Sequence, residues 1–420
     1  MRVDVPDAAR LGSSSARFLT HSVPSPGISG DRIRVFHLIK ALKARGWTVR
    51  LWSLVGPHEP AGSADAVNAI ADEVVLVPRG VSDRTRRLRL ARDIIARRAL
   101  QAHWFWSPAT ARAAAAWLAD LNGDALFVEQ LYMYPFVPRH LRSRAVLDTQ
   151  NHETARIRAM AIGEGSLGRR TVARLQVGPV EAYERAALSS VGSVLAVSAA
   201  EFEAFERVAP GRVRLVPNGV DARAVSPVSG PPRSEELLFL GSLGYGANVD
   251  AVRHFAVDIA PHLVGFGSTL TVVGSHPTSA VADAAAAAAI PVIVAGYAPD
   301  LRPYFARCRA MVVPLRHGGG TRLKILEAMA WGIPVVTTSI GGEGLGLRDG
   351  HDALIADDPA AFAAAVRRVT TDDDLWRELS AAGRTLVVER YDWQDIAKGF
   401  EKVMCEVADA ALARQTIGSR

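Results

Sequence analysis

The chain is poor in the features that mark secreted or cysteine-rich proteins. Its 420 residues include two cysteines, Cys308 and Cys405. Two cysteines exclude a disulfide framework and a cysteine-rich metal site. The N-terminus carries Arg2 and Arg10 but no continuous apolar run, so it does not predict a signal peptide.

A long apolar run is also missing. The most apolar tract, 280–298, is mostly alanine and is interrupted by Asp283, Pro291 and Gly296. We therefore expect a helix followed by a strand in this tract, and not a membrane span. Together with the N-terminus, this predicts a cytoplasmic protein.

Positive charge is present but spread along the chain. The formal net charge is +6, and we find no concentrated basic stripe with interleaved aromatic residues, as a nucleic-acid-binding surface would need. The densest run holds seven arginines, the first Arg84 and the last Arg98, among leucines and isoleucines. It indicates either a solvated helix face, which we favour, or a basic amphipathic helix that contacts the inner face of a membrane peripherally.

The length and composition predict two domains. A chain of 420 residues that is 49% hydrophobic can bury two sizeable cores. Proline, serine and glycine become frequent at the end of the first half, which is typical of a linker. We place an N-terminal domain at 1–222, a linker at 223–234, a C-terminal domain at 235–390 and a final segment at 391–420.

Strand and helix patterns alternate along both halves, which predicts an α/β fold with parallel sheets covered by helices on both faces. Strands are expected at 18–21, 47–54, 74–77, 126–128, 145–147, 194–197, 214–216, 236–241, 271–273, 292–294, 310–314 and 335–338. Helices are expected from Asp31 to a stop at Gly46, and from Pro359, Asp372 and Trp393.

The segment 317–334 carries the strongest functional signal. Three glycines, Gly318, Gly319 and Gly320, follow a strand and precede a helix expected at 321–331, with Gly332 at its C′ position. Glycines let a ligand approach the backbone closely, and the helix N-terminus directs unpaired N–H groups and a positive dipole to the same place. The pattern predicts an anion site.

Charged residues in this helix refine the prediction. Arg322 and Lys324 lie in the first turn, where cations are unfavourable unless an anion is bound, so we expect a phosphate or diphosphate. Thr321, Lys324 and Glu327 share one helix face. Glu327 is placed to accept hydrogen bonds from ribose hydroxyls. The alternative is a flexible loop followed by an ordinary Lys324–Glu327 surface pair.

Other glycine turns after strands are weaker candidates. Gly30 stands at a strand-to-helix turn, but a plain loop with a helix cap at Asp31 explains it equally well. The segment 241–248, GSLGYGAN, is a second glycine-rich turn of this kind. Tyr297 follows a strand and could pack on a nucleotide base, although a core tyrosine is the more common outcome.

A polar cluster, DTQNHE, occupies 148–153 directly after a strand, where ligand-facing loops of open α/β sheets lie. His152 could bond a substrate hydroxyl, and Asp148 or Glu153 could serve as acid or base. Equally, these residues could cap a helix that begins near Glu153, with Asn151 as the N-cap.

Several segments resemble retaining, family 4-type glycosyltransferases (glycosyl transferases group 1) of the GT-B fold. The resemblance covers nearly the whole chain and is most specific in GGGTRLKILEAMAWGIPVVTT at 318–338. Further matching segments are PSPGISGDRIRVFHL, VEAYERAALSSVGSVLAVS, VPNGVD and FLGSLGYGANVDAV.

The resemblance implies two Rossmann-like domains that face a central cleft. The second domain would hold most of a UDP- or GDP-sugar, the first would hold the acceptor, and the final helix would return to the first domain. The implied reaction moves the sugar to a glycan, lipid-linked or small-molecule acceptor with retained configuration, as in polysaccharide biosynthesis. No metal or other cofactor is expected, because protein cations would stabilise the leaving diphosphate.

The same resemblance assigns roles to individual residues. Glu327 would bind the donor ribose, Gly318 to Thr321 would donate backbone hydrogen bonds to the phosphates, and Tyr297 would lie near the base. Gly30 would lie near the donor phosphates or sugar. The turn of the second domain would contribute Gly241, Ser242 and Asn248 to the donor site.

The chain departs from the family pattern at three positions. Gly319 replaces a glutamate, Asn248 stands near the place of a lysine, and Gln150 replaces a common histidine. We expect Arg322 and Lys324 to supply the missing positive charge in catalysis, and His152 to contact the donor sugar. Two alternatives are a GT-B nucleotide-sugar epimerase and a sugar-nucleotide-binding protein without turnover.

Overall fold

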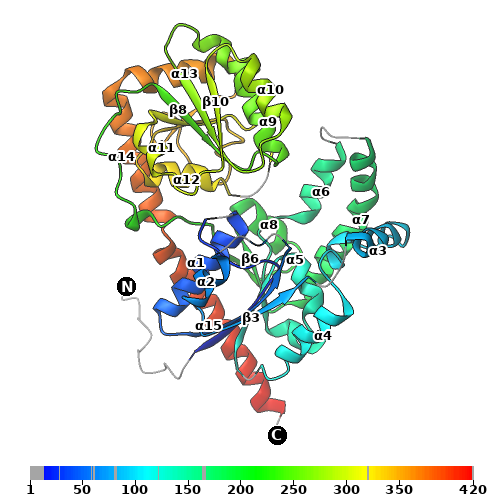
Figure 1. Cartoon of the computed structure of the whole chain (residues 1–420). Helices are drawn as coiled ribbons and strands as arrows, with labels where there is room; N and C mark the ends of the chain where they lie inside the picture. The colour runs from blue at the N-terminus through cyan, green and yellow to red at the C-terminus, as the bar shows by residue number, and fades with distance from the viewer. Residues whose placement is uncertain are drawn as a thin grey trace. The chain divides into compact units, whose positions relative to one another are not determined.

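The computed structural model describes residues 14–27, 29–57, 59, 62–79, 83–121, 123–162, 167–318 and 321–418. These residues form two compact units (Figure 1). The first unit runs to Val216 and includes the chain from Ala397 onward, and the second unit spans Pro217–Ile396. Among the described residues, no helix combines the length and the apolar character needed to cross a membrane.

The first unit is built on a seven-stranded parallel sheet in the order β3-β2-β1-β4-β5-β6-β7. All seven predicted strands are present, and the largest shift is at β1, which begins at Ser15 instead of Phe18. Their bounds are β1 (Ser15–Thr20), β2 (Thr48–Val55), β3 (Glu73–Pro78), β4 (Ala125–Glu129), β5 (Ala145–Asp148), β6 (Ser193–Ala196) and β7 (Val213–Leu215).

Strand β1 lies at the centre of this sheet, between β2 and β4. Connections run outward on one side through β2 and β3, and on the other side through β4 to β7. The residues of β4, β5 and β6 are buried throughout, as expected for strands covered on both faces. The carboxyl ends of β1 and β4 therefore form the switch point of this sheet, where open α/β folds bind ligands.

Helices cover both faces of the first sheet (Figure 1). The predicted helix after β1 begins at Gly30, one residue before the expected Asp31, and the chain turns at Gly46 with a positive φ. The helices are α1 (Gly30–Ala44), α2 (Ser63–Asn68), α3 (Asp83–Ile95), α4 (Pro108–Trp117), α5 (Gln130–Met133), α6 (Glu153–Ile162), α7 (Leu167–Ser190) and α8 (Ala199–Glu206).

The second unit contains a six-stranded parallel sheet in the order β10-β9-β8-β11-β12-β13. Its strands are β8 (Glu236–Leu240), β9 (Thr269–Val273), β10 (Val292–Gly296), β11 (Ala310–Val313), β12 (Val335–Thr337) and β13 (Leu354–Ile355). We did not predict β13, because two residues show no periodicity. The switch point of this sheet lies between β8 and β11.

The helices of the second unit are α9 (Gly246–His254), α10 (Ser279–Ala287), α11 (Arg302–Arg307), α12 (Leu323–Ala330), α13 (Pro359–Thr371) and α14 (Asp373–Arg390). The alanine-rich tract 280–298 is confirmed as a helix, α10, followed by a strand, β10. The predicted start of α12 at Thr321 is wrong by two residues, since the backbone of Arg322 still has ψ near 69°. A helical residue needs a negative ψ.

The last helix, α15 (Trp393–Gly418), contributes its residues from Ala397 onward to the first unit. Phe400 is fully buried, with its ring centroid 6.4 Å from that of Phe18 and 5.8 Å from that of Phe127. The indole Nε1 of Trp47 donates to Glu401 Oε1 at 2.9 Å. The core of the first unit therefore uses side chains from both ends of the described chain.

Candidate active site

Polar side chains of the second unit converge at the switch point of its sheet. The turn after β8 brings Gly241 against Asn248 of α9 and Lys324 of α12. Lys324 Nζ donates to Asn248 Oδ1 at 2.8 Å, and Asn248 Nδ2 donates to the carbonyl oxygen of Ser242 at 2.9 Å. The structure thus brings together four predicted site residues from two adjacent strand ends.

Gly241 is required at this point for two reasons. Its φ is +154°, which side-chain-bearing residues rarely adopt, and its backbone N–H is held by Val273 O at 3.0 Å. A Cβ placed on Gly241 would lie 2.6 Å from Asn248 Nδ2 and 2.8 Å from Lys324 Nζ. The ammonium group of Lys324 therefore rests directly against the glycine backbone.

Lys324 and Glu327 stand one turn apart on α12 and are both partly buried. Burial lowers the pKa of Lys324 to about 7, and the nearby charge of Arg322 adds to this effect while Glu327 opposes it. Burial raises the pKa of Glu327 to about 7, with Lys324 opposing. Lys324 Nζ also lies 4.2 Å from the centroid of the Phe239 ring. A bound anion would favour the charged form of Lys324.

Arg322 precedes α12 and is buried, in spite of its charge. Its NH2 group donates to the carbonyl oxygens of Gly318 at 2.9 Å and Ile340 at 3.3 Å. Arg322 thus joins the loop after β11 to the loop after β12. Burial lowers the pKa of its guanidinium group, which indicates a cation held where little water compensates it.

The loop after β11 is held by residues that the sequence analysis did not select. Asp250 of α9 pairs with Arg316 Nη2 at 2.5 Å and with His317 Nδ1 at 3.5 Å. Burial opposes ionisation of Asp250, but the bond and charge of Arg316 hold its pKa below the usual range. Gly318 has φ +126°, and a Cβ there would lie 3.7 Å from Tyr245 Oη. Gly319 and Gly320 lie outside the described residues.

Helix α12 ends as the sequence predicts. Gly332 N donates to Met329 O at 3.0 Å, and Ile333 N donates to Ala328 O at 2.8 Å, which is the Schellman pattern. Gly332 occupies the C′ position with φ +72°. At the other end, Leu323 N donates to Thr321 O at 3.0 Å, so Thr321 lies in the turn that leads into the helix.

Tyr297 is not brought into this convergence. It follows β10, the edge strand, which is separated from β8 by β9. Its side chain is 64% exposed, which rules out the core position that we weighed as its more common alternative. An exposed ring at a strand end is available for stacking on a base.

In the first unit, His152 lies beside a buried carboxylate. His152 Nε2 is 3.5 Å from Glu184 Oε2, and its ring meets Phe205 edge-on at 5.4 Å. The first N–H groups of α6, from Glu153 and Thr154, bond to Glu184 at 2.8 and 3.1 Å. The expected cap by Asn151 is therefore replaced by a carboxylate from α7.

Asp148 is a structural counter-ion in this fold. It is fully buried, as is Arg34 of α1, and Arg34 contacts both of its carboxylate oxygens, at 2.8 and 2.9 Å. Gln150 has φ +57° and also donates to Asp148, at 3.0 Å. The interpretation of Asp148 as an acid or base that meets a substrate is wrong, because its oxygens are already bonded and unexposed. Gly30 forms the first residue of α1.

A buried charged cluster at the switch point of the first sheet escaped the sequence analysis. His21 follows β1, and its Nδ1 lies 2.9 Å from Glu129 Oε2 while its Nε2 lies 3.4 Å from Asp31 Oδ2. Burial disfavours the imidazolium, but the two carboxylates outweigh it and raise the pKa of His21 to about 9. A histidine and a glutamate at two neighbouring strand ends were a signal that could have been used.

This cluster is the one group in the described part of the chain with a spacing that suits a metal ion, since its ligand atoms lie within 4.8 Å of one another. However, each ring nitrogen of His21 faces a carboxylate. A histidine needs an unprotonated nitrogen to bind a metal. The imidazolium itself therefore neutralises the two carboxylates.

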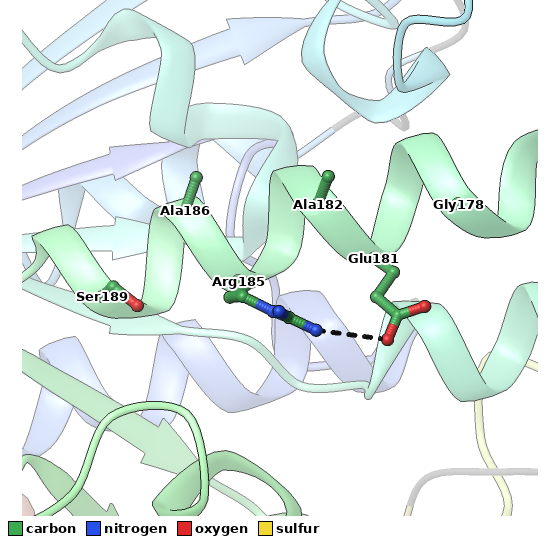
Figure 2. A pocket seen from close by; sticks show the side chains of 6 residues that line it. All are labelled: Gly178, Glu181, Ala182, Arg185, Ala186 and Ser189. Atoms are coloured by element: carbon green, nitrogen blue, oxygen red, sulfur yellow. Dashed lines mark hydrogen bonds and ion pairs between the residues drawn. The ribbon is translucent and has the colours of Figure 1, made fainter.

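Figure 2 shows a hollow on one face of α7, lined by Gly178, Glu181, Ala182, Arg185, Ala186 and Ser189. One helix supplies every lining residue, and Arg185 is paired with Glu181 at 3.5 Å. The hollow lacks the convergence of polar groups from several elements that ligand sites show.

Comparison with known proteins agrees with this geometry. The family model described as "Glycosyltransferase Family 4" matches residues 28–224, and the model "Glycosyl transferases group 1" matches residues 234–372. The chain belongs to the family 4-type glycosyltransferases of the GT-B fold. The two models divide the chain much as the two sheets do.

Named relatives of this GT-B glycosyltransferase are moderately similar. A D-inositol 3-phosphate glycosyltransferase of Acidothermus cellulolyticus is 29% identical over 64% of this chain and 63% of its own length. A glycogen synthase of Mycobacterium tuberculosis is 31% identical over 48% of this chain and 50% of its own length. The chain thus matches less than two thirds of either relative.

Solved structures share the fold. Sucrose-phosphate synthase of Thermosynechococcus elongatus has a TM-score of 0.66 at 20% identity, covering 97% of this chain and all of the other (100%). HepE of Anabaena, solved in complex with UDP and glucose, has a TM-score of 0.62 at 14% identity, covering 94% of this chain and 100% of the other. At such low sequence identities, the similarity shows that the chain has the GT-B fold but does not show which substrate it uses.

Proposed function

We propose that this protein transfers a sugar from a UDP- or GDP-sugar to an acceptor with retained configuration. The observation that carries the proposal is the contact of Lys324 Nζ with Asn248 Oδ1, against the backbone of Gly241. It places a partly buried cation at the switch point of the second sheet, where α/β folds bind nucleotides. HepE, which shares the fold, was solved with UDP and glucose, which supports a nucleotide sugar as donor.

Within this proposal, Lys324 and Arg322 stabilise the diphosphate as it leaves. Lys324 reaches Asn248, the position near which the family usually has a lysine. The cation is therefore supplied from α12 instead of α9. Gly318 to Thr321 donate backbone N–H groups to the phosphates, Glu327 binds the ribose, and Tyr297 stacks on the base. Gly30 and His152 serve the donor phosphates and sugar from the first unit.

Nucleotide release measured with a panel of UDP- and GDP-sugars and acceptors tests the proposal. We expect release with at least one pair and a thermal shift with the free nucleotide. The anomeric configuration of the product, read by NMR, tests retention. Sugar that changes configuration without any acceptor would identify an epimerase. Nucleotide binding without any product would identify a binding protein.

Substitution of Lys324 tests its proposed role. Lys324→Met keeps most of the side-chain length and removes a charge-assisted contact worth about 1.5–3 kcal/mol, so donor affinity should fall about tenfold or more. Arg302→Met is the matched control, since Arg302 is exposed and paired with Asp300 in the same unit. Equal affinity of Lys324→Met and wild type would contradict the role.

The proposed reaction needs no metal, because Arg322 and Lys324 act on the diphosphate. Turnover should therefore be unchanged after treatment with EDTA. A loss that Mg²⁺ restores would contradict this part of the proposal.

The proposal places the reaction in the cytoplasm, with peripheral membrane contact through α3 as a further element. Its arginines stand among Leu88 and Ile95, and both of these apolar side chains are exposed. A basic helix with exposed apolar residues suits an anionic interface. Flotation with phosphatidylglycerol vesicles should decrease when Arg87, Arg89 and Arg92 are replaced by glutamate. Unchanged flotation would mean that α3 is a solvated face.

A further inference from the structure

A second, larger pocket lies wholly within the first unit. Its volume is about 620 Å³, and it is enclosed by α5, α6, α7, the residue after β1 and the 3₁₀ turn η2 (Leu100–Ala102). Unlike the hollow of Figure 2, it draws its lining from several elements. Convergence of this kind is typical of a ligand site.

The walls of this pocket are largely apolar. Ile157 of α6 and Val172 of α7 line it, and Ala173 continues into a small buried core shared by the two helices. Trp104 and Met160 also line it, with 38% and 45% of their surfaces exposed. Apolar surface that stays accessible beside a pocket indicates an apolar ligand.

Polar groups gather at the side of the pocket near Tyr132. Arg156 Nη2 lies 3.5 Å from Tyr132 Oη, and the ring of His21 lies 6.0 Å from that of Tyr132. Arg169 of α7 is a third basic residue that lines the pocket. His21 is balanced by its own carboxylates, and Arg156 pairs with Glu153. The described residues that line the pocket include no acidic side chain.

Gln101 is a buried polar residue in the wall of this pocket. It is 4% exposed. Its Nε2 donates to Glu153 Oε2 at 3.1 Å, but no donor among the described residues reaches its Oε1. A buried acceptor without a partner costs about 1–3 kcal/mol, but Oε1 has almost no accessible surface. Gln101 therefore makes this wall more polar without offering Oε1 to a ligand in the pocket.

We propose that this pocket binds an amphiphile, with its apolar chain along Ile157 and Val172 and its phosphate head toward Arg156 and Arg169. This rests on the proposed function in one respect, since it names the class of acceptor as a lipid-linked phosphate with a free hydroxyl group. The binding step itself requires no donor sugar.

Calorimetry with decyl phosphate below its micelle concentration tests the proposal on the full chain. Decyl phosphate should bind, and inorganic phosphate and decanol should each bind at least about tenfold more weakly, since each lacks one of the two parts of the ligand. Decanol or phosphate binding as well as decyl phosphate would overturn the proposal.

Two pairs of variants on α7 locate the site. Val172→Asp and Arg169→Glu should each weaken decyl phosphate binding about tenfold or more, through a charge in the apolar wall and the loss of a cation. Leu175→Asp and Arg185→Glu are matched controls on the same helix outside the pocket, and should bind as wild type does. Equal binding by Val172→Asp and Leu175→Asp would overturn the proposal.

Two further measurements distinguish ligand binding in this pocket from the proposed transferase function and from binding to a membrane surface. A thermal shift with UDP that persists while decyl phosphate fails to bind would reject the pocket and leave the proposed function standing. Decyl phosphate binding without any response to nucleotides would do the reverse. The last measurement uses the variant with Arg87, Arg89 and Arg92 of α3 replaced by glutamate. If this variant still binds phosphatidylglycerol vesicles while monomeric decyl phosphate does not bind, Arg156 and Arg169 belong to a membrane surface, and the pocket is rejected.

Discussion

The contacts of Asn248 and Lys324 in the second unit depend on Gly241 having no side chain. Gly241→Ala should displace Asn248 and Lys324, because the new Cβ would lie 2.6 and 2.8 Å from their terminal nitrogens. We expect nucleotide affinity to fall about tenfold, the effect of one lost charge-assisted contact. Gly265→Ala is the control, since Gly265 also has a positive φ, +85°, but faces open space. An equal loss of nucleotide affinity in both variants would mean that backbone strain, and not displacement of Asn248 and Lys324, causes the effect.

The titration of Lys324 gives a second prediction at this scale. The pKa of the buried ammonium is lowered to about 7, so it carries its charge below that pH and loses it above. Affinity for a UDP-sugar should therefore fall as the pH rises through about 7. Glu327 titrates in the same range, so the measurement belongs in a Glu327→Gln background. There the fall should move to a lower pH, because the charge of Glu327 no longer raises the pKa of Lys324. Adding Lys324→Met should flatten the profile, and a fall that persists would assign it to another group.

The lowered pKa of Lys324 also affects the free energy of unfolding, but in the opposite direction with pH. Between a folded pKa of about 7 and the ordinary value of 10.5 for Lys324, the unfolded chain binds the proton that the folded chain has lost. Stability from this group therefore rises with pH across that window. Affinity and stability should move in opposite directions as the pH rises, which a general loss of structure would not produce.

At the scale of elements, the buried pair of Arg34 and Asp148 joins α1 to β5. Arg34→Met should leave the Asp148 charge without its partner inside the protein and lower the free energy of unfolding by about 3–5 kcal/mol. The double variant Arg34→Met/Asp148→Asn should recover a large part of this loss, since both charges are gone. Urea unfolding measures both, and a double variant no more stable than Arg34→Met would contradict the explanation.

Sequence patterns predicted most elements, for reasons that individual segments make clear. The strands β4 to β6 were visible as apolar runs, and Gly332 was visible as a helix end. The start of α12 was missed because the first-turn pattern does not reveal the dihedral angles of Arg322. Capping of α6 by Glu184 was missed because the acceptor lies 31 positions from Glu153 in the sequence.

The sequence likewise predicted some residues of the candidate site and missed others. Gly241, Asn248 and Lys324 were selected from local motifs, but their mutual contacts depend on β8 and β11 being neighbours in the sheet. The cluster of His21, Asp31 and Glu129 was missed because Glu129 lies 108 positions from His21 in the sequence. Local patterns predict which residues are unusual, and topology decides which of them meet.

For the whole molecule, the two units have separate cores. Phe400→Ala should lower the stability of the first unit by about 3–5 kcal/mol, because it removes a fully buried ring. The second unit should keep its thermal shift with UDP. Hydrogen exchange resolved by peptide should show reduced protection in β1 and β4 but not in β8 and β11. Reduced protection in both units would mean that they unfold as one.

The return of α15 to the first unit also bears on how the chain is made. The seven strands of the first sheet are synthesised before the second unit. Phe400 and Glu401 are synthesised only after every residue of the second unit. Domains usually fold in the order in which they are synthesised. Here the second unit, Pro217–Ile396, is the first to leave the ribosome with all of its residues. Until Phe400 is synthesised, the rings of Phe18 and Phe127 lack their contact with it, so we expect the core of the first unit to be completed after that of the second.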